Sequence, residues 1–517
     1  MTLPYLPVLT LLPLVGAGVV LALPSGRPPQ LAKVVALGFT LVELLITVVM
    51  CATFVAGGAR FQFVNSYTWI PEFGVRFGFG SDGIALVLIA LVAVLMPVVV
   101  LASWHDAEPG RRPVKSFFAL LLALETTTIG VFAATDLFLF YVFFEAMLVP
   151  MYFLISSYGG PRRQYAAVKF FLYSLAGGLL MLAALIALYV VGKHQGINSF
   201  AFADLVKLNI AQSTQRWLFL GFFIAFAIKA PLVPFHTWLP DAGAEAPIGT
   251  AVLLVGVLDK VGTYGFLRWC LPLFPDASKF FAPLVLVLAV IGILYGALLA
   301  MGQQDLKRLI AYTSVAHFGF IALGIFAFTS QGGTGAVLYM VNHGLSTGAL
   351  FLVIGFLISR RGSRLSRDFG GWARATPLIS GAFLVAGMSA LALPGTNTFI
   401  SEFLVLLGTF AVNRPVAVIA ATGMILAALY ILLMYQRTMH GPLSATLPKK
   451  LRDMSTREAW VIAPVLVLVV ALGVYPKPLI DVITPAVNAT MHDIGKSDPA
   501  PSAREGVPAA TTTGGGK

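Results

Sequence analysis

The sequence predicts an all-α integral membrane protein with about fourteen transmembrane helices, and three observations support this. The 517 residues are 58% hydrophobic and only 11% charged, whereas about 25% of the residues in a soluble domain are charged. The hydrophobic residues are grouped into runs, and about 20 such residues suffice to cross a bilayer. Two runs are interrupted by proline or glycine beside a charged residue, a pattern typical of membrane proteins with sites at the bilayer midplane.

Fourteen apolar runs follow one another along the chain. They lie at residues 3–23, 34–56, 84–103, 116–134, 137–157, 168–192, 217–239, 249–272, 281–302, 309–329, 335–358, 377–411, 416–436 and 459–475. The first run has no basic residue before Arg27, so it is predicted to be a span and not a cleaved signal. After Asp481 the chain is rich in Ser, Pro, Ala, Thr and Gly, and this tail is predicted to be disordered.

The interrupted runs are the seventh and the twelfth, each the fourth helix of a five-helix group. An odd number of helices per group gives successive copies opposite orientations, so helices 4–8 and 9–13 are predicted to be inverted repeats with broken helices 7 and 12. The predicted parts are three N-terminal helices (1–115), the first repeat (116–272), the second repeat (281–436), a C-terminal loop with the last helix (437–480) and the polar tail (481–517).

Basic residues are distributed unevenly over the predicted loops. Loops after odd-numbered helices contain twenty Lys and Arg residues, and loops after even-numbered helices contain seven. Because basic loops remain in the cytoplasm, both termini are predicted to lie on the outer side of the membrane. The net charge of +12 then reports orientation, and no binding of nucleic acid is predicted.

Composition also excludes several kinds of site. Cys51 and Cys270, the two cysteines, both lie in apolar runs and provide neither a disulfide framework nor an iron–sulfur or zinc site. No G-x-G-x-x-G motif opens a predicted βα unit, so no dinucleotide site is expected. The chain is therefore predicted to bind no metal or cofactor, and any redox chemistry would belong to another polypeptide.

Lys229 is the most informative residue, because it lies in the middle of the seventh run. A lysine at this depth is costly and is expected to face protein or water. Pro231 and Pro234 cannot donate to the carbonyls of Ala227 and Ala230, which predicts a broken helix. Lys229 would then occupy the partially negative end of a half-helix. The competing interpretation is a proline kink whose lysine reaches the membrane interface.

Glu402 has the opposite placement in the twelfth run. It follows the interruption at residues 393–398, and it is predicted to lie at the partially positive beginning of the second half-helix. The two interruptions therefore predict mirrored sites, with a cation before one break and a carboxylate after the other.

Four further ionisable residues lie deep in apolar runs: Glu145, Lys260, His317 and His343. A buried charge is retained only with a partner, so Glu145 and Lys229 are predicted to pair. Lys260, His317, His343 and Glu402 are predicted to form a lateral wire for protons. For each histidine, a structural role in the core remains the alternative.

Four long motifs resemble the antiporter-like membrane subunits of respiratory complex I. They are K-A-P-L-V-P-F-H-T-W-L-P-D-A-x-x-E-A-P at 229–247, D-K-V-G-T-Y-G-F-L-R at 259–268, D-L-K-R-L-I-A-Y-T-S-V-A-H-F-G-F at 305–320 and V-N-H-G-L-S-T-G-A-L-F at 341–351. The resemblance covers about residues 80–440. Sodium/proton antiporter subunits and membrane hydrogenase subunits share the fold.

The resemblance implies a proton-translocating subunit of an NADH:quinone oxidoreductase in a bacterial cytoplasmic membrane. Lys229 matches the pumping lysine paired with the glutamate at Glu145, Lys260 matches the connecting lysine, and Glu402 matches the outlet residue. Glutamate at 402 favours the M-type branch, with L- and N-type subunits as neighbours. FMN, iron–sulfur clusters and quinone are expected in partner subunits.

Two positions depart from the family pattern. Gly243 replaces an expected histidine, so any role of that histidine is absent or moved. Asp259 replaces an apolar residue before Lys260, and it either pairs elsewhere or adds an acid to the wire. His236 and Asp259 are therefore further candidates for the site.

Two other functions remain as alternatives. One is a cation/proton antiporter or hydrogenase subunit of the same fold. The other is a solute permease, which would need one midplane pocket for an organic substrate.

Overall fold

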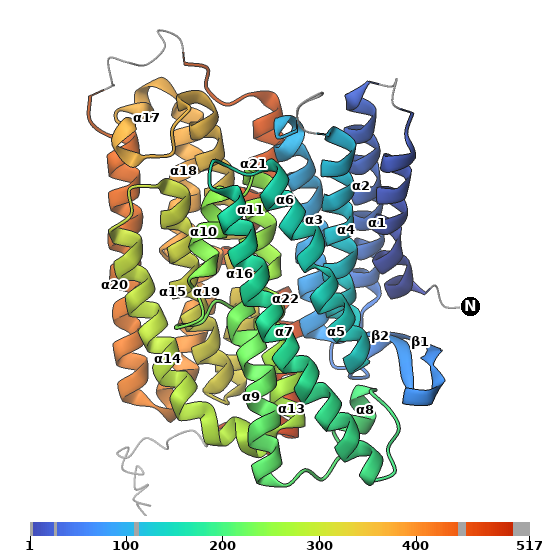
Figure 1. Ribbon diagram of the computed structural model, residues 1–517. Helices are drawn as coiled ribbons and strands as arrows, with labels where there is room; N and C mark the ends of the chain where they lie inside the picture. Colours follow the sequence, from blue (N-terminus) through green and yellow to red (C-terminus); the bar gives the residue numbers. More distant parts are fainter. Residues whose placement is uncertain (1–3, 25–27, 108–112, 443–450, 500–517) are drawn as a thin grey trace, which may run out of the picture.

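The computed structural model describes residues 4–24, 28–107, 113–442 and 451–499, which form a bundle of long helices (Figure 1). A backbone surrounded by hydrocarbon can satisfy its hydrogen bonds within helices, which is why long apolar runs become helical. Within the described residues, twelve helical segments are long and apolar enough to cross a membrane. They coincide with twelve of the predicted runs. The other two, 217–239 and 377–411, are the interrupted runs, and the total of fourteen spans stays a prediction.

The N-terminal part combines long helices with a β-hairpin. Its elements are α1 (Tyr5–Ala22), α2 (Pro29–Thr53), β1 (Gln62–Ile70), η1 (Pro71–Phe73), β2 (Val75–Ser81), α3 (Gly83–Ala102) and η2 (Ser103–His105). β1 and β2 pair antiparallel, with Tyr67 opposite Phe77, and Gly74 adopts the positive φ of 68° that the turn requires. The all-α prediction omits this hairpin, although its alternating aromatic and β-branched residues are a strand pattern.

Most candidate residues lie on the middle and C-terminal elements. The middle elements are α4 (Val114–Ala133), α5 (Leu137–Ala146), α6 (Leu148–Tyr158), α7 (Arg163–His194), α8 (Phe202–Leu205), α9 (Gln212–Lys229), α10 (Trp238–Glu245), α11 (Ile248–Leu253), η3 (Leu254–Leu258), α12 (Lys260–Gly265), η4 (Phe266–Cys270) and α13 (Leu271–Leu273). The C-terminal elements are α14 (Pro275–Met301), α15 (Leu306–Phe326), α16 (Ser330–Arg361), η5 (Ser366–Asp368), α17 (Trp372–Ala375), α18 (Pro377–Ala390), α19 (Asn397–Val412), α20 (Arg414–Met439), α21 (Thr456–Val474) and α22 (Lys477–Asp493).

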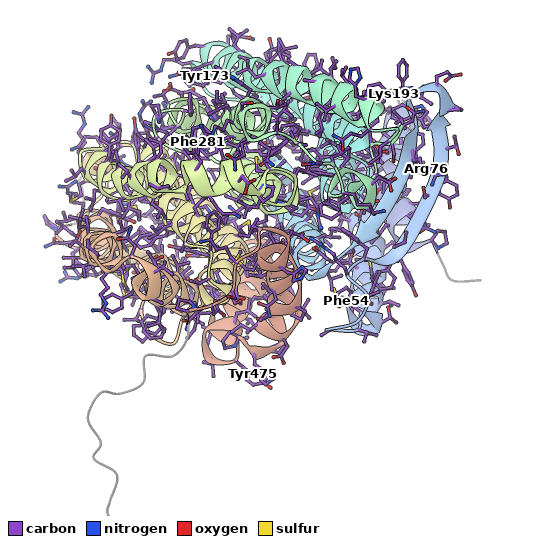
Figure 2. The ribbon with its side chains drawn as sticks, turned by 90° about the horizontal axis from the view of Figure 1, so that it is seen from below. Phe54, Arg76, Tyr173, Lys193, Phe281 and Tyr475 are labelled. Atoms are coloured by element: carbon purple, nitrogen blue, oxygen red, sulfur yellow. The ribbon has the colours of Figure 1, made fainter. Side chains whose placement is uncertain are left out.

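The most buried parts of the bundle are the stretch from α11 to α13 and helices α15 and α16, whose side chains are almost all buried. Viewed along the bundle, Tyr173 of α7 and Tyr475 beside α21 lie on opposite sides (Figure 2). Arg162, Arg308 and Arg364 lie at one end of the bundle, where α10 supplies their carboxylate partners. Arg162 and Arg364 share Glu245, and Arg308 pairs with Asp241. We call this the basic end.

Helix breaks are more frequent than the two that the sequence predicts. α5 ends before α6 where Pro150 cannot donate to the carbonyl of Ala146. Helices η3 and η4 are π-helical segments in one otherwise α-helical stretch, and such segments are frequent at functional sites.

The predicted disordered tail begins too early. Residues 477–493 form α22, so disorder from Asp481 is wrong for this segment. Ile483, Val487 and Met491 recur at helical spacing and are buried, and Val487 packs where Gly333 of α16 lacks a side chain. This apolar face stabilises the helix despite its polar sequence. Residues 500–517 lie outside the described residues.

Candidate functional site

Lys229 is the last residue of α9, as the two prolines predict. The chain continues without regular helix until Trp238, where α10 begins. Ala227 O accepts a hydrogen bond from Leu232 N at 2.9 Å, and Ile228 O accepts one from Trp238 Nε1 at 2.8 Å. The carbonyl groups at the end of the half-helix thus obtain other donors, and the amine of Lys229 lies at its partially negative end.

The amine of Lys229 lies near two aromatic rings. The side chain is 1% exposed, and Nζ lies 5.3 Å from the ring centroid of Phe144 and 5.2 Å from that of Phe170. Nζ has no hydrogen-bond partner among the described residues. Ring faces attract a cation without a directional bond, so this environment can hold the ammonium group and still allow it to move.

Glu145, near the end of α5, lies close enough to Lys229 for an electrostatic interaction. Within the described residues the two side chains form neither a hydrogen bond nor a direct ion pair, and Glu145 is only half-buried. A Cβ atom at Gly178 of α7 would collide with Oε1 of Glu145. Gly178 therefore provides the space for this carboxylate. The structure brings the predicted pair together but leaves a gap between the charged atoms.

Lys260 begins α12, directly after the first π-helical segment. Its Nζ lies 3.0 Å from Asp259 Oδ1 and 2.6 Å from His343 Nδ1, and it donates to Val255 O. Asp259 therefore pairs with Lys260 itself. This contradicts the alternative in which Asp259 pairs elsewhere and leaves the one in which it adds an acid to the wire. The long lysine side chain turns back along the helix, so adjacent positions can meet although their Cβ atoms diverge. Both side chains are 0% exposed.

The two predicted histidines continue from Lys260. The ring of His343 in α16 lies 5.2 Å from the ring of His317 in α15, at an interplanar angle of 89°. Nε2 of His317 lies 3.3 Å from the hydroxyl oxygen of Tyr430. The remaining ring nitrogens, Nε2 of His343 and Nδ1 of His317, have no hydrogen-bond partner among the described groups.

Glu402 lies in α19 and accepts a hydrogen bond from the hydroxyl of Tyr339. The ring of Tyr339 is 5.7 Å from the ring of His317, and the Tyr430 hydroxyl interacts electrostatically with Glu402. Two tyrosines therefore connect His317 to Glu402. Neither tyrosine was predicted from the sequence, although Tyr339 precedes His343 by one helical turn and shares its face.

The prediction of mirrored helix ends is wrong for Glu402. The break between α18 and α19 is present, but Glu402 is the sixth residue of α19, after its first turn. The helix dipole acts mainly within the first turn. Two hydrogen bonds instead connect the start of α19 to α16. Asn342 Nδ2 donates to Asn397 O at 2.7 Å, and Asn397 Nδ2 donates to Asn342 O at 3.2 Å.

These contacts define a buried polar chain that runs from Asp259 through Lys260, His343, His317 and the two tyrosines to Glu402. Lys229 and Glu145 lie before it. Between the two groups, α12 packs against the end of α9, where a Cβ atom at Gly262 would collide with Phe226 O. Lys229 and Lys260 share no side-chain hydrogen bond within the described residues.

His236 does not join the buried polar chain. It lies between α9 and α10, is 5% exposed, and its ring contacts Tyr295 at 5.6 Å. Asp241, which follows His236 in the same motif, lies at the basic end. It pairs there with Lys169 at 2.7 Å and with Arg308 at 2.6 Å. At Gly243, a Cβ atom would approach Ala311 Cβ to 3.3 Å, so a larger residue there would press on α15.

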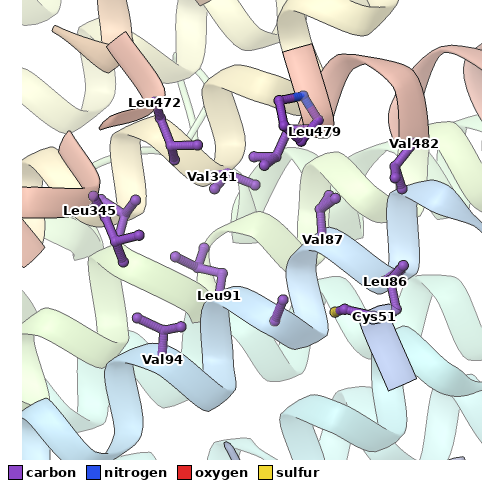
Figure 3. Close-up of a pocket in the computed structure, with 13 residues that line it drawn as sticks. Cys51, Leu86, Val87, Leu91, Val94, Val341, Leu345, Leu472, Leu479 and Val482 are labelled. Carbon is purple, nitrogen blue, oxygen red and sulfur yellow. The ribbon is translucent and has the colours of Figure 1, made fainter. Parts of the chain in front are cut away.

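A pocket of about 340 Å³ lies between α2, α3, α16, α21 and α22 (Figure 3). Its lining is apolar apart from Cys51 and includes Leu91, Val341 and Leu472. No predicted site residue lines it. The pocket lacks the polar groups with which a permease would orient a polar solute.

Comparisons with known proteins identify the family. Residues 134–428 match the model of the NADH:quinone oxidoreductase/Mrp antiporter transmembrane family. NADH-quinone oxidoreductase subunit M of Mycobacterium tuberculosis is 48% identical over 98% of this chain and 97% of its own length. The subunit M of Rhodobacter capsulatus is 41% identical over 93% of this chain and 95% of its own length.

A solved structure agrees with this assignment. A chain of respiratory complex I from Thermus thermophilus with bound NADH superimposes with a TM-score of 0.86 and 30% identity, covering 95% of this chain and 100% of that one. This protein therefore belongs to the NADH:quinone oxidoreductase/Mrp antiporter transmembrane family.

Proposed function

We propose that this chain is a proton-translocating, M-type membrane subunit of an NADH:quinone oxidoreductase. The observation that supports this most is the buried polar chain, whose groups on α12, α15, α16, α19 and α20 follow one another inside an apolar bundle. Groups that bind and release protons in series are what proton transfer requires. A solute site would gather its polar groups around one cavity.

Glu145 and Lys229 provide the electrostatic control in this proposal. When a negative charge at Glu145 attracts the ammonium group, Lys229 is held among its rings near α5. Loss of that charge frees Lys229 to move toward α12 or to release its proton. The coupling is reciprocal, because a cation at Lys229 equally favours the ionised form of Glu145.

The buried polar chain then carries the proton laterally. Asp259 balances the charge of the Lys260 ammonium group, which passes its proton to His343 Nδ1. Lys260 is then neutral, and the positive charge lies on the imidazolium of His343. Ring flips or a bridging water pass the proton from His343 to His317, and the Tyr430 hydroxyl lies within reach of His317 Nε2. Glu402 receives the proton, and Tyr339 stabilises its carboxylate after release.

Partner subunits complete the reaction. NADH oxidation and quinone reduction take place on FMN and iron–sulfur clusters in other chains, and L- and N-type subunits flank this one in the membrane. Glu145 is half-buried in the isolated chain, so a charge on a neighbouring subunit can reach it. The complex resides in a bacterial cytoplasmic membrane with both termini of this chain outside.

The proposed conduction is tested with Lys260→Met, which keeps the length of the side chain but removes the amine. Because Asp259 would be left as an unpaired buried acid, the double variant Asp259→Asn/Lys260→Met is the matched form without that charge. Proton translocation by membrane vesicles, per NADH oxidised and per assembled complex, should fall severalfold in both. Parental translocation in the double variant would exclude conduction through Lys260.

The proposed orientation is tested with single cysteines at two exposed positions, in a background carrying Cys51→Ser. Arg367→Cys lies in the basic loop before α17, and Lys193→Cys lies at the end of α7. An impermeant thiol reagent applied to intact cells should label Lys193→Cys alone. Labelling of Arg367→Cys alone would show that the chain has the opposite orientation.

A further inference from the structure

Two buried glutamates lie outside the buried polar chain. Glu43 in α2 is 0% exposed and Glu125 in α4 is 1% exposed. Their carboxyl groups face each other closely enough for a hydrogen bond from one to the other. The proposed path, which runs through other helices, does not use them.

Within the described residues, the neighbouring helices bring no cation to this pair. α1 and α3 contact α2 and α4, and neither carries a charged side chain within its bounds. The charged groups of the other elements that contact α4 have other neighbours: Glu145 of α5 faces Gly178, Lys260 of α12 binds Asp259, and Arg76 of β2 lies at the hairpin. The tyrosines of these helices also have other neighbours: Tyr141 interacts with Glu145, Tyr152 packs on Phe171, Tyr158 donates to Pro113 O and Tyr264 donates to Phe132 O.

The lysines on α2 and α4 are also held away. Lys33 and Lys115 each precede the glutamate of their helix by ten residues, which is about 15 Å of helix. Lys33 Nζ lies 2.5 Å from Trp104 O, and Lys115 Nζ donates to Leu23 O. Both ammonium groups therefore have carbonyl partners remote from the two carboxyl groups.

The carboxyl groups of the pair and a neighbouring hydroxyl have no hydrogen-bond donor or acceptor among the other described groups. All four carboxyl oxygens lack a hydrogen bond from any described N–H or O–H donor. Thr47, one turn after Glu43 on the same face, is 1% exposed, and its Oγ1 has no partner either.

We propose that Glu43 and Glu125 form a proton-binding site in which at least one proton is held between the two carboxyl groups at neutral pH. Two carboxylates in contact within a medium of low dielectric constant cannot both remain ionised. The O–H of one carboxyl donates to an oxygen of the other, which supplies the donor that the surrounding helices lack. The site lies in the N-terminal helices and joins α2 to α4.

Infrared spectroscopy of the intact purified complex tests this site, because a protonated carboxyl has a C=O stretch that a carboxylate lacks. The double variant Glu43→Gln/Glu125→Gln keeps shape and hydrogen-bonding groups but cannot be protonated. The difference spectrum, parental minus double variant, should contain a positive protonated-carboxyl band at neutral pH. Glu72→Gln, which removes an exposed carboxylate, should produce no such band.

A difference spectrum that contains only carboxylate bands would overturn the proposal, since both groups would then be ionised. Sodium could also raise the thermal stability of the parental complex but not that of the double variant. That result would show that the two carboxylates bind a cation, and it too would overturn the proposal. If the double variant does not assemble, Glu43→Gln and Glu125→Gln are measured singly. Each should shift the band, because an amide replaces the carboxyl partner, and an unshifted spectrum in both would contradict a shared proton.

Discussion

The two broken helices hold their ionisable groups in different ways. Lys229 ends α9, and its amine lies near two phenylalanine rings without a hydrogen-bond partner among the described residues. Glu402 lies beyond the first turn of α19 and accepts a hydrogen bond from Tyr339. The first site depends on a helix end and on non-directional contacts, and the second depends on one directed bond.

This difference has a consequence for motion. A cation held by ring faces and a helix dipole can shift by about an ångström without breaking any bond. A carboxylate bound to a buried hydroxyl loses that bond when it moves, at a cost of about 1.5–3 kcal/mol. Lys229 is therefore suited to respond to a distant charge, whereas Glu402 is suited to receive and release a proton in place.

The largest expected effect follows Lys229→Ala. Removing the amine leaves the half-buried Glu145 without its nearby cation, and the carboxyl group would then lose its electrostatic control. We expect the complex to assemble and to lose most of its proton translocation. Vesicle acidification normalised to assembled complex measures this.

Lys207→Ala is the matched control, because Lys207 is an exposed lysine paired only with Asp204 among the described residues. It should translocate protons at the parental level. Parental translocation by an assembled Lys229→Ala complex would remove Lys229 from the mechanism.

Glu402→Gln should follow with a somewhat smaller loss. Glutamine can still accept from Tyr339, so local structure is retained, but the group can no longer bind a proton. We expect translocation to fall severalfold while assembly and thermal stability stay near parental values. The next residue, Phe403, has no carboxyl group that could take over this role. An unchanged proton-to-electron ratio would therefore mean that the outlet lies elsewhere.

A steric test at the first site is Gly178→Ala, which changes no ionisable group. The added Cβ would collide with Glu145 Oε1, and the flexible glutamate must then turn away from Lys229. We expect translocation to fall severalfold and thermal stability to change little. Gly381→Ala, where a Cβ meets nothing within 4 Å, serves as the control. Equal translocation by the two variants would show that the position of Glu145 is unimportant.

The smallest effect is expected when the hydroxyl beside Glu402 is removed. Tyr339→Phe deletes the donor to the carboxylate, with an expected cost of about 1.5–3 kcal/mol for its ionised form. Tyr430→Phe deletes only a 3.3 Å contact with His317. Proton-translocation rates should therefore fall more in Tyr339→Phe than in Tyr430→Phe, and the reverse order would transfer the main role to Tyr430.

The sequence by itself determined the membrane class and the position of most helices, and it supplied most of the ionisable candidates for the path. Length and composition suffice for the spans, because hydrocarbon requires long apolar helices. Pro231 and Pro234 predict the end of α9 at Lys229, because a missing N–H acts locally. A charge at membrane depth is costly wherever it occurs, which identified Glu145, Lys229, Lys260, His317, His343 and Glu402 as candidates.

Tertiary structure alone decided which of these groups touch. The pairing of Asp259 with Lys260 depends on a side chain turning back beside a π-helical segment, and helical spacing predicts the opposite. Tyr339 becomes the partner of Glu402 because α16 packs against α19, a contact between residues 63 positions apart. The meeting of Glu43 with Glu125 likewise depends on how α2 packs against α4. Periodicity reports which face of a helix is apolar, but the neighbour of that face follows from the packing of the whole bundle.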